Sequence, residues 1–142
     1  MNEIVIPKYS DIEIGQTAEV KHTITDDDIQ TFGELSGDKN PLHFNQEWAE
    51  TTMFKGRIAH GLLTAAFVST AIGMKLPGPG TIYLSQHMNF RKPVHIGDTL
   101  TTTVEVTEKN DEKEHITLTT TVLNQKGKTV LDGYAIVTLM RE

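Results

Sequence analysis

The stretch Gly61–Met74, GLLTAAFVSTAIGM, decides the fold because it contains no charged residue. Apolar or small side chains occupy the whole circumference of a helix with this sequence, whereas a helix at a protein surface shows a polar face. The stretch is too short to span a bilayer, which takes about 20 residues. We therefore expect one long central helix that is buried on every side, with a larger structure wrapped around it.

The sequence that follows this helix predicts antiparallel strands. Four segments alternate apolar and polar side chains with the period of two that is typical of strands: Thr81–Phe90, Asp98–Lys109, Glu114–Asn124 and Thr129–Met140. The last three are joined by Asn110-Asp111 and Gln125-Lys126-Gly127, which favour hairpin turns. PGPG at 77–80 predicts a turn between the helix and the first strand. We expect a long antiparallel meander.

The residues before the helix predict one more strand and two short helices. Thr17–Ile24 alternates as a strand, and Thr25 is a typical N-cap, followed by three aspartates that favour the positive end of a helix dipole. This first helix should end near Leu35. An irregular segment, 36–45, and a short helix around 46–52 are expected to follow it.

A curved antiparallel sheet wrapped around one long buried helix is an α+β fold of the hotdog kind. The chain has 142 residues, of which 37% are hydrophobic, so we expect one domain spanning residues 1–142. The last strand also carries Val130, Tyr134 and Ile136 on its second face. A covered outer face would follow from a second copy of the chain, so we expect a homodimer or a higher homo-oligomer.

Composition excludes several classes of function. The formal net charge of −6 argues against nucleic acid as a partner, because phosphate binding needs a basic face. The absence of cysteine excludes disulfides, zinc–thiolate sites and thiol nucleophiles. The six histidines show no metal-binding spacing such as HExxH, so no metal is expected. Without a membrane span or a secretion signal, the chain is expected to be a cytoplasmic protein.

Asp38 and His43 are the first candidates for chemistry. They lie five residues apart, and the turn-forming pair Asn40-Pro41 between them can bring the two side chains together on one water molecule. An imidazole moves protons near neutral pH, and a carboxylate can orient it or share the proton transfer. The alternative is a purely structural loop in which the aspartate binds its own backbone.

Two further features concern the central helix. His60-Gly61 precedes it with no capping side chain nearby, so its first N–H groups are open to an oxyanion. The alternative is that Gly61 only permits close packing on the sheet. Ser69 lies two turns into the helix beside small alanines, with Thr64 and Thr70 as lesser candidates. Its hydroxyl has an alternative partner in the Ala65 carbonyl of its own helix.

Three blocks of sequence resemble the MaoC-like dehydratase family, and in particular its single-hotdog (R)-specific enoyl-CoA hydratases. The blocks are SGDKNPLH at 36–43, RIAHGL at 57–62, and GTIYLSQ at 80–86 followed by FRKPV at 90–94. They occur in order within residues 12–139, nearly the whole chain. The resemblance implies a hydro-lyase that adds water reversibly to trans-2-enoyl thioesters in fatty-acid or hydroxyalkanoate metabolism.

The resemblance also implies roles for single residues. Asp38 and His43 match the catalytic pair that holds and activates the water. Gly61 matches the backbone donor to the thioester carbonyl, with His60 beside it at the substrate, and Ser69 matches the helix serine that accompanies the pair. Asn40 would shape the loop around the substrate.

Coenzyme A would enter as part of the substrate, so no separate cofactor is expected. Its phosphates need cations, and the candidates that flank the motifs are Lys55, Arg57 and above all Arg91 and Lys92. A 3-hydroxyacyl-[acyl-carrier-protein] dehydratase and a non-catalytic acyl-thioester-binding hotdog protein remain alternatives. A thioesterase is disfavoured, because the helix carries no carboxylate to activate water.

Overall fold

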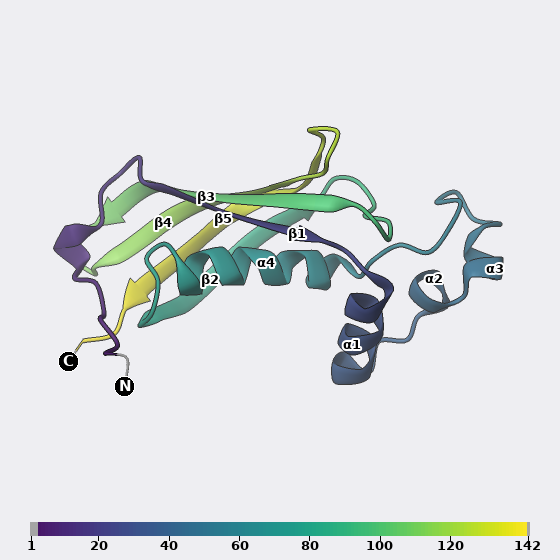
Figure 1. Cartoon of the computed structure of the whole chain (residues 1–142). Helices are drawn as coiled ribbons and strands as arrows, with labels where there is room; N and C mark the ends of the chain where they lie inside the picture. Colours follow the sequence, from purple (N-terminus) through teal and green to yellow (C-terminus); the bar gives the residue numbers. More distant parts are fainter. Residues whose placement is uncertain (1–2, 142) are drawn as a thin grey trace.

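The computed structural model describes residues 3–141. Figure 1 shows a curved sheet with one long helix, α4, along its inner face and three short helices beyond the N-terminal end of α4. In chain order the elements are a single 3₁₀ turn Tyr9–Asp11, β1 Thr17–Thr23, α1 Asp26–Ser36, α2 Pro41–Phe44, α3 Gln46–Ala49, α4 Gly61–Met74, β2 Thr81–Phe90, β3 Thr99–Asn110, β4 His115–Leu123 and β5 Thr129–Leu139. The predicted hotdog fold is confirmed.

The five strands form one antiparallel sheet in the order β1-β3-β4-β5-β2. The predicted meander holds for β3, β4 and β5, but it is wrong for β2, which pairs with β5 at the sheet edge and not with β3. Residues 91–98 carry the chain from this edge across the sheet to β3, which lies beside the opposite edge strand β1. This connection is longer than a hairpin turn, so turn chemistry cannot fix which strand β2 joins.

The core lies between α4 and the concave face of the sheet. From α4 come Leu63, Val68, Ala71 and Ile72, and the sheet contributes a larger set that includes Leu100, Val104, Val106, Ile116, Leu118, Val122, Leu131, Ala135 and Val137. Burying each large aliphatic side chain contributes about 1.5–3 kcal/mol. Packing of the helix on the sheet therefore fixes where α4 begins, which is the end that carries the candidate site.

The structure confirms the bounds predicted for α4 but not its complete burial. Leu62 and Met74 are 61% and 70% exposed, and Ala66, Ser69 and Thr70 lie on the same uncovered side. The sheet of a single chain covers only one side of α4. A sequence without charges indicates that a helix avoids water, but it does not say whether its own chain or another provides the cover.

The segment between β1 and α4 is more helical than expected. The Thr25 hydroxyl and the Asp28 carboxylate cap α1 reciprocally, at 3.1 and 2.9 Å. The predicted irregular segment 36–45 contains the single turn α2, because Asn40 accepts a hydrogen bond from Leu42 N–H at 3.1 Å and Pro41 suits the first helical position. Within residues 3–141, no helix is long and apolar enough to cross a membrane.

Candidate active site

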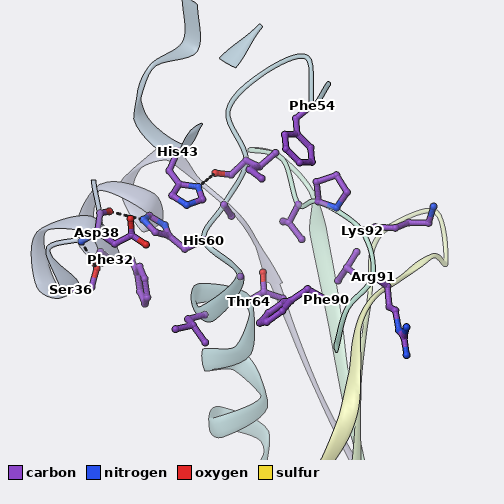
Figure 2. Close-up of a pocket in the computed structure, with 17 residues that line it drawn as sticks. Phe32, Ser36, Asp38, His43, Phe54, His60, Thr64, Phe90, Arg91 and Lys92 are labelled. Atoms are coloured by element: carbon purple, nitrogen blue, oxygen red, sulfur yellow. Dashed lines mark hydrogen bonds between the residues drawn. The ribbon is translucent and has the colours of Figure 1, made fainter. Parts of the chain in front are cut away.

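A cavity of about 640 Å³ opens at the N-terminal end of α4. Figure 2 shows its side chains converging from the loop after α1, from α2, from the start of α4 and from the end of β2. The lining is mostly apolar and includes Phe32, Ser36, Asp38, His43, Phe54, Ile58, Ala59, His60, Gly61, Leu62, Thr64, Phe90, Arg91, Lys92, Pro93, Val94 and Val130. The polar side chains that reach this cavity all come from the sequence motifs, with the exception of Thr64.

His43 on α2 is held with a defined proton arrangement. Its Nδ1 lies 2.8 Å from the main-chain oxygen of Ile58. Because a carbonyl oxygen only accepts hydrogen bonds, Nδ1 carries the hydrogen and the neutral ring keeps its lone pair on Nε2. His43 is therefore arranged to accept a proton at Nε2.

The surroundings of His43 favour its neutral form. Burial lowers the pKa of the imidazole below its usual 6.5, and His60 acts in the same direction. The hydrogen bond to Ile58 and the charge of Asp38 act in the opposite direction without reversing the net shift. A neutral imidazole is the form that serves as a general base.

Asp38 lies in the exposed loop between α1 and α2. Its Oδ1 accepts a hydrogen bond from Asn40 N–H at 3.2 Å, which is the loop-bracing contact that the structural alternative expects. Oδ2 has no hydrogen-bond partner among residues 3–141. One oxygen of Asp38 thus shapes the loop, and the other remains available to a ligand.

Asp38, His43 and His60 form one cluster. Their side-chain ligand atoms all lie within 4.8 Å of one another, a spacing at which one water molecule can contact more than one of them. Such a trio could also hold a metal ion. The sequence motifs predict that all three residues lie at the entry to α4, but the spacing of the histidines does not indicate a metal site there. The expectation of no metal stays a prediction.

Gly61, the first residue of α4, places its backbone at the cavity wall. Its N–H belongs to the first turn, which has no partner within the helix, and no described residue outside the helix accepts from it. A Cβ at this position would lie 2.8 Å from the Phe90 ring. The site thus offers a backbone donor where a side chain would not fit without moving Phe90.

Two predicted binding residues lie outside the cavity of the single chain. Ser69 is exposed on the uncovered side of α4, and Asn40 caps α2. Neither contributes to the lining. Their roles at the substrate stay predictions.

The four candidate cations differ in their surroundings. Arg91 and Lys92 line the mouth of the cavity, and Arg91 Nε is paired with Asp132 Oδ2 at 3.0 Å. Lys55 does not line the cavity. The Arg57 side chain is only 13% exposed and pairs with Asp26, so it is poorly placed to meet a phosphate.

Sequence reasoning missed two groups that shape the site. One is the Ile58 carbonyl, which sets the proton arrangement of His43. The other is Phe90, whose ring covers Gly61. A backbone carbonyl carries no side-chain signal, and Phe90 reads in the sequence as an ordinary apolar strand residue.

Comparisons with known proteins agree with this architecture. Residues 10–128 match the family described as MaoC like domain. The chain is 46% identical over 136 residues to an (R)-specific enoyl-CoA hydratase of Rhodospirillum rubrum, covering 96% of this chain and 94% of that protein. It is 42% identical to a 3-hydroxybutyryl-CoA dehydratase of Methylorubrum extorquens, covering 95% and 85%.

A solved structure shares both fold and sequence. The unliganded R-hydratase PhaJ1 from Pseudomonas aeruginosa superposes with a TM-score of 0.88 at 47% identity, covering 94% of this chain and 86% of that one. The family match spans most of the domain, including every residue of the Asp38–His43–His60 cluster. The chain belongs to the MaoC-like domain family.

Proposed function

We propose that the chain is an (R)-specific enoyl-CoA hydratase, a hydro-lyase that adds water reversibly across the C2=C3 bond of trans-2-enoyl-CoA. The convergence of His43, Asp38 and the Gly61 N–H on one largely apolar cavity carries this proposal. The similarity to named hydratases and dehydratases over nearly the whole chain supports it.

The first step is the attack of water on C3. In this proposal water lies between Asp38 and His43, and Nε2 of the neutral imidazole accepts a proton as the oxygen bonds to C3. The C2=C3 electrons move toward the thioester, and negative charge develops on its carbonyl oxygen. The Gly61 N–H donates to that oxygen; one such donor lowers a barrier by about 3 kcal/mol.

The second step returns a proton to C2. The C=C–O⁻ electrons of the intermediate move back, the carbonyl re-forms, and C2 takes a proton from the Asp38–His43 pair. Because the two groups interact closely, the proton belongs to the pair. We assign the product as the (R)-3-hydroxyacyl thioester, an assignment that the similarity to (R)-specific enoyl-CoA hydratases supports.

The coenzyme A portion of the bound substrate is proposed to extend out of the cavity past Arg91 and Lys92. The pantetheine arm suits the apolar mouth, and the phosphates need the cations at its rim. Lys92 has no carboxylate partner within residues 3–141, whereas the charge of Arg91 is partly balanced by Asp132. Lys92 is thus the stronger candidate.

We also propose a homodimer. The uncovered side of α4 and the edge strand β2 both expose large apolar side chains, among them Leu62, Met74, Ile82, Leu84 and Phe90. A second copy would cover them and would bring Ser69 into an enclosed surface. Sedimentation equilibrium at micromolar concentration should give twice the chain mass of 15.8 kDa, and a monomer would overturn this assembly.

The function is tested by adding purified protein to crotonyl-CoA and following the loss of enoyl-thioester absorbance. Chiral analysis of the product should give (R)-3-hydroxybutyryl-CoA. The (S) product would contradict the stereochemical assignment. Turnover of crotonyl-acyl-carrier-protein without turnover of crotonyl-CoA would favour the dehydratase alternative, and binding of both without turnover would favour a non-catalytic protein.

A further inference from the structure

His60, the N-cap residue of α4, is the most deeply buried titratable residue at the site. Its relative exposure is 2%, and aromatic rings surround it. The centroid of its ring lies 4.0 Å from that of His43, 4.7 Å from that of Phe32 and 5.7 Å from that of Phe44. Figure 2 shows His60 between Asp38 and His43. So buried a ring offers little surface to a substrate.

The hydrogen bonding of His60 shows which of its ring nitrogens carries the hydrogen. Nε2 lies 2.9 Å from the main-chain oxygen of Asp38, and since that oxygen only accepts, Nε2 carries the hydrogen. Nδ1 is buried and has no hydrogen-bond partner within residues 3–141. The main-chain oxygen of His60 accepts from Leu63 and Thr64 N–H, which anchors the first turn of α4. His60 therefore connects the Asp38 loop to the helix that carries Gly61.

The hydrogen bond between His60 and Asp38 has no substitute. The other hydrogen bonds of Asp38 go to Ser36 and Asn40, two residues away on either side. Among the described residues, only His60 joins Asp38 by a hydrogen bond to another part of the fold. His43, in contrast, is held independently by Ile58 and Arg57. Loss of the His60 contact would leave Asp38 fixed only by its own loop.

We infer that His60 is a positioning residue that fixes Asp38 relative to His43 and to the Gly61 N–H. The inference rests on the proposed function for its catalytic consequence. The hydrogen bond sets the place of the Asp38 backbone, and the His60 ring, tilted by 31° against that of His43, restricts the His43 imidazole on one face. A displacement of about 1 Å in such a site can cost about 100-fold in rate.

Two matched substitutions test this role. In His60→Gln the amide nitrogen can take the place of Nε2 and donate to the Asp38 carbonyl, whereas in His60→Asn the same amide is one methylene too short. We expect kcat for crotonyl-CoA hydration to fall about 100-fold in His60→Asn and less than about tenfold in His60→Gln, with KM changed less than about twofold in both. His115→Asn, on β4 away from the cavity, is the control.

A spectroscopic readout separates this inference from the proposed function. In ¹⁵N NMR spectra the amide of Asp38 and the ring nitrogens of His43 should shift strongly in His60→Asn and return toward wild-type positions in His60→Gln. Equal kcat in the two variants, a loss confined to KM, or unchanged Asp38 and His43 resonances would overturn the role of His60. If the wild type hydrates no enoyl thioester, the function fails, and the resonances still decide the positioning role.

Discussion

Arg57 donates a hydrogen bond from Nε to the main-chain oxygen of His43 at 2.6 Å. The same guanidinium donates from Nη2 to Asp26 at the start of α1, also at 2.6 Å. One largely buried cation thus ties α1 to the helical turn that carries His43. Arg57, one of the candidate phosphate ligands, thus supports the backbone of His43, the candidate base.

Replacing Arg57 by methionine should therefore impair both stability and activity. The change keeps much of the apolar stem but leaves the His43 carbonyl and Asp26 without their donor. Hydrogen bonds to charged groups contribute about 1.5–3 kcal/mol, so we expect urea denaturation to show a loss of about that size. The rate of crotonyl-CoA hydration should also fall, and the fall should appear in kcat. Arg141→Met, which removes an exposed pair with Glu114, is the control and should change neither by much.

The pH dependence of hydration should reflect the lowered pKa of His43. Since His43 must be neutral to accept a proton, kcat/KM should fall as the pH drops through its pKa. Burial lowers that pKa, so the midpoint of the acid limb should lie below pH 6.5. A midpoint above 6.5 would mean that the burial of His43 does not control its protonation.

The lowered pKa of His43 also makes the stability of the fold depend on pH. The unfolded chain binds a proton at His43 near pH 6.5, more readily than the folded chain does, so acidification favours unfolding. The contribution of His43 to stability is complete above pH 6.5 and is lost as the pH falls from 6.5 toward the folded-state pKa. In His43→Gln, unfolding measured between pH 7 and 5 should show a weaker pH dependence than in the wild type.

A methyl group at Gly61 should block the site without unfolding the protein. The added Cβ would lie 2.8 Å from the Phe90 ring, which is half-exposed and can move into the cavity mouth. We expect Gly61→Ala to lower kcat/KM by more than about tenfold, with an unfolding midpoint close to that of the wild type. Gly56→Ala is a matched control, because its Cβ would meet Gln46 at an ordinary 3.6 Å. Equal activity in the two variants would mean that the substrate does not approach the Gly61 backbone closely.

Lys92→Gln should weaken binding of coenzyme A thioesters with little effect on chemistry. We expect KM for crotonyl-CoA to rise about three- to tenfold at low salt and the effect to shrink as salt increases. Crotonyl-N-acetylcysteamine lacks the phosphates and should show no difference between variant and wild type. Lys128→Gln in the β4–β5 turn is the control for a general change in charge. A rise in KM for both substrates would rule out a phosphate contact by Lys92.

Sequence alone predicts much of this fold because its determinants are local. The bounds of α4 follow from an uncharged stretch that ends at Lys75, just before the PGPG turn, and the first turn of α1 follows from the capping pair Thr25 and Asp28. The place of β2 in the sheet does not follow, because it depends on which edge a connection of several residues reaches. The exposure of one side of α4 does not follow either, because it depends on how far the sheet reaches around the helix.

The part of the site that could be predicted is the part in which one short motif contains both interacting residues. Asp38 and His43 converge because a capped turn, begun by Asn40 and Pro41, separates them. The contact between His60 and Asp38 spans 22 residues, and that between Arg57 and Asp26 spans 31, so neither leaves a local pattern. Charge alone made Arg57 look like a ligand for phosphate, whereas burial shows that it supports the fold.

The central claim, that Asp38 and His43 activate water for addition to an enoyl thioester, is tested most directly by the rate of crotonyl-CoA hydration in Asp38→Asn. The substitution keeps the size of the side chain and an oxygen for the Asn40 N–H, but it removes the negative charge. Asp27→Asn, an exposed change of the same kind in the first turn of α1, is the matched control. The account predicts a fall in kcat of about 100- to 10,000-fold for Asp38→Asn alone. Hydration by Asp38→Asn within a few-fold of the wild-type rate would contradict it.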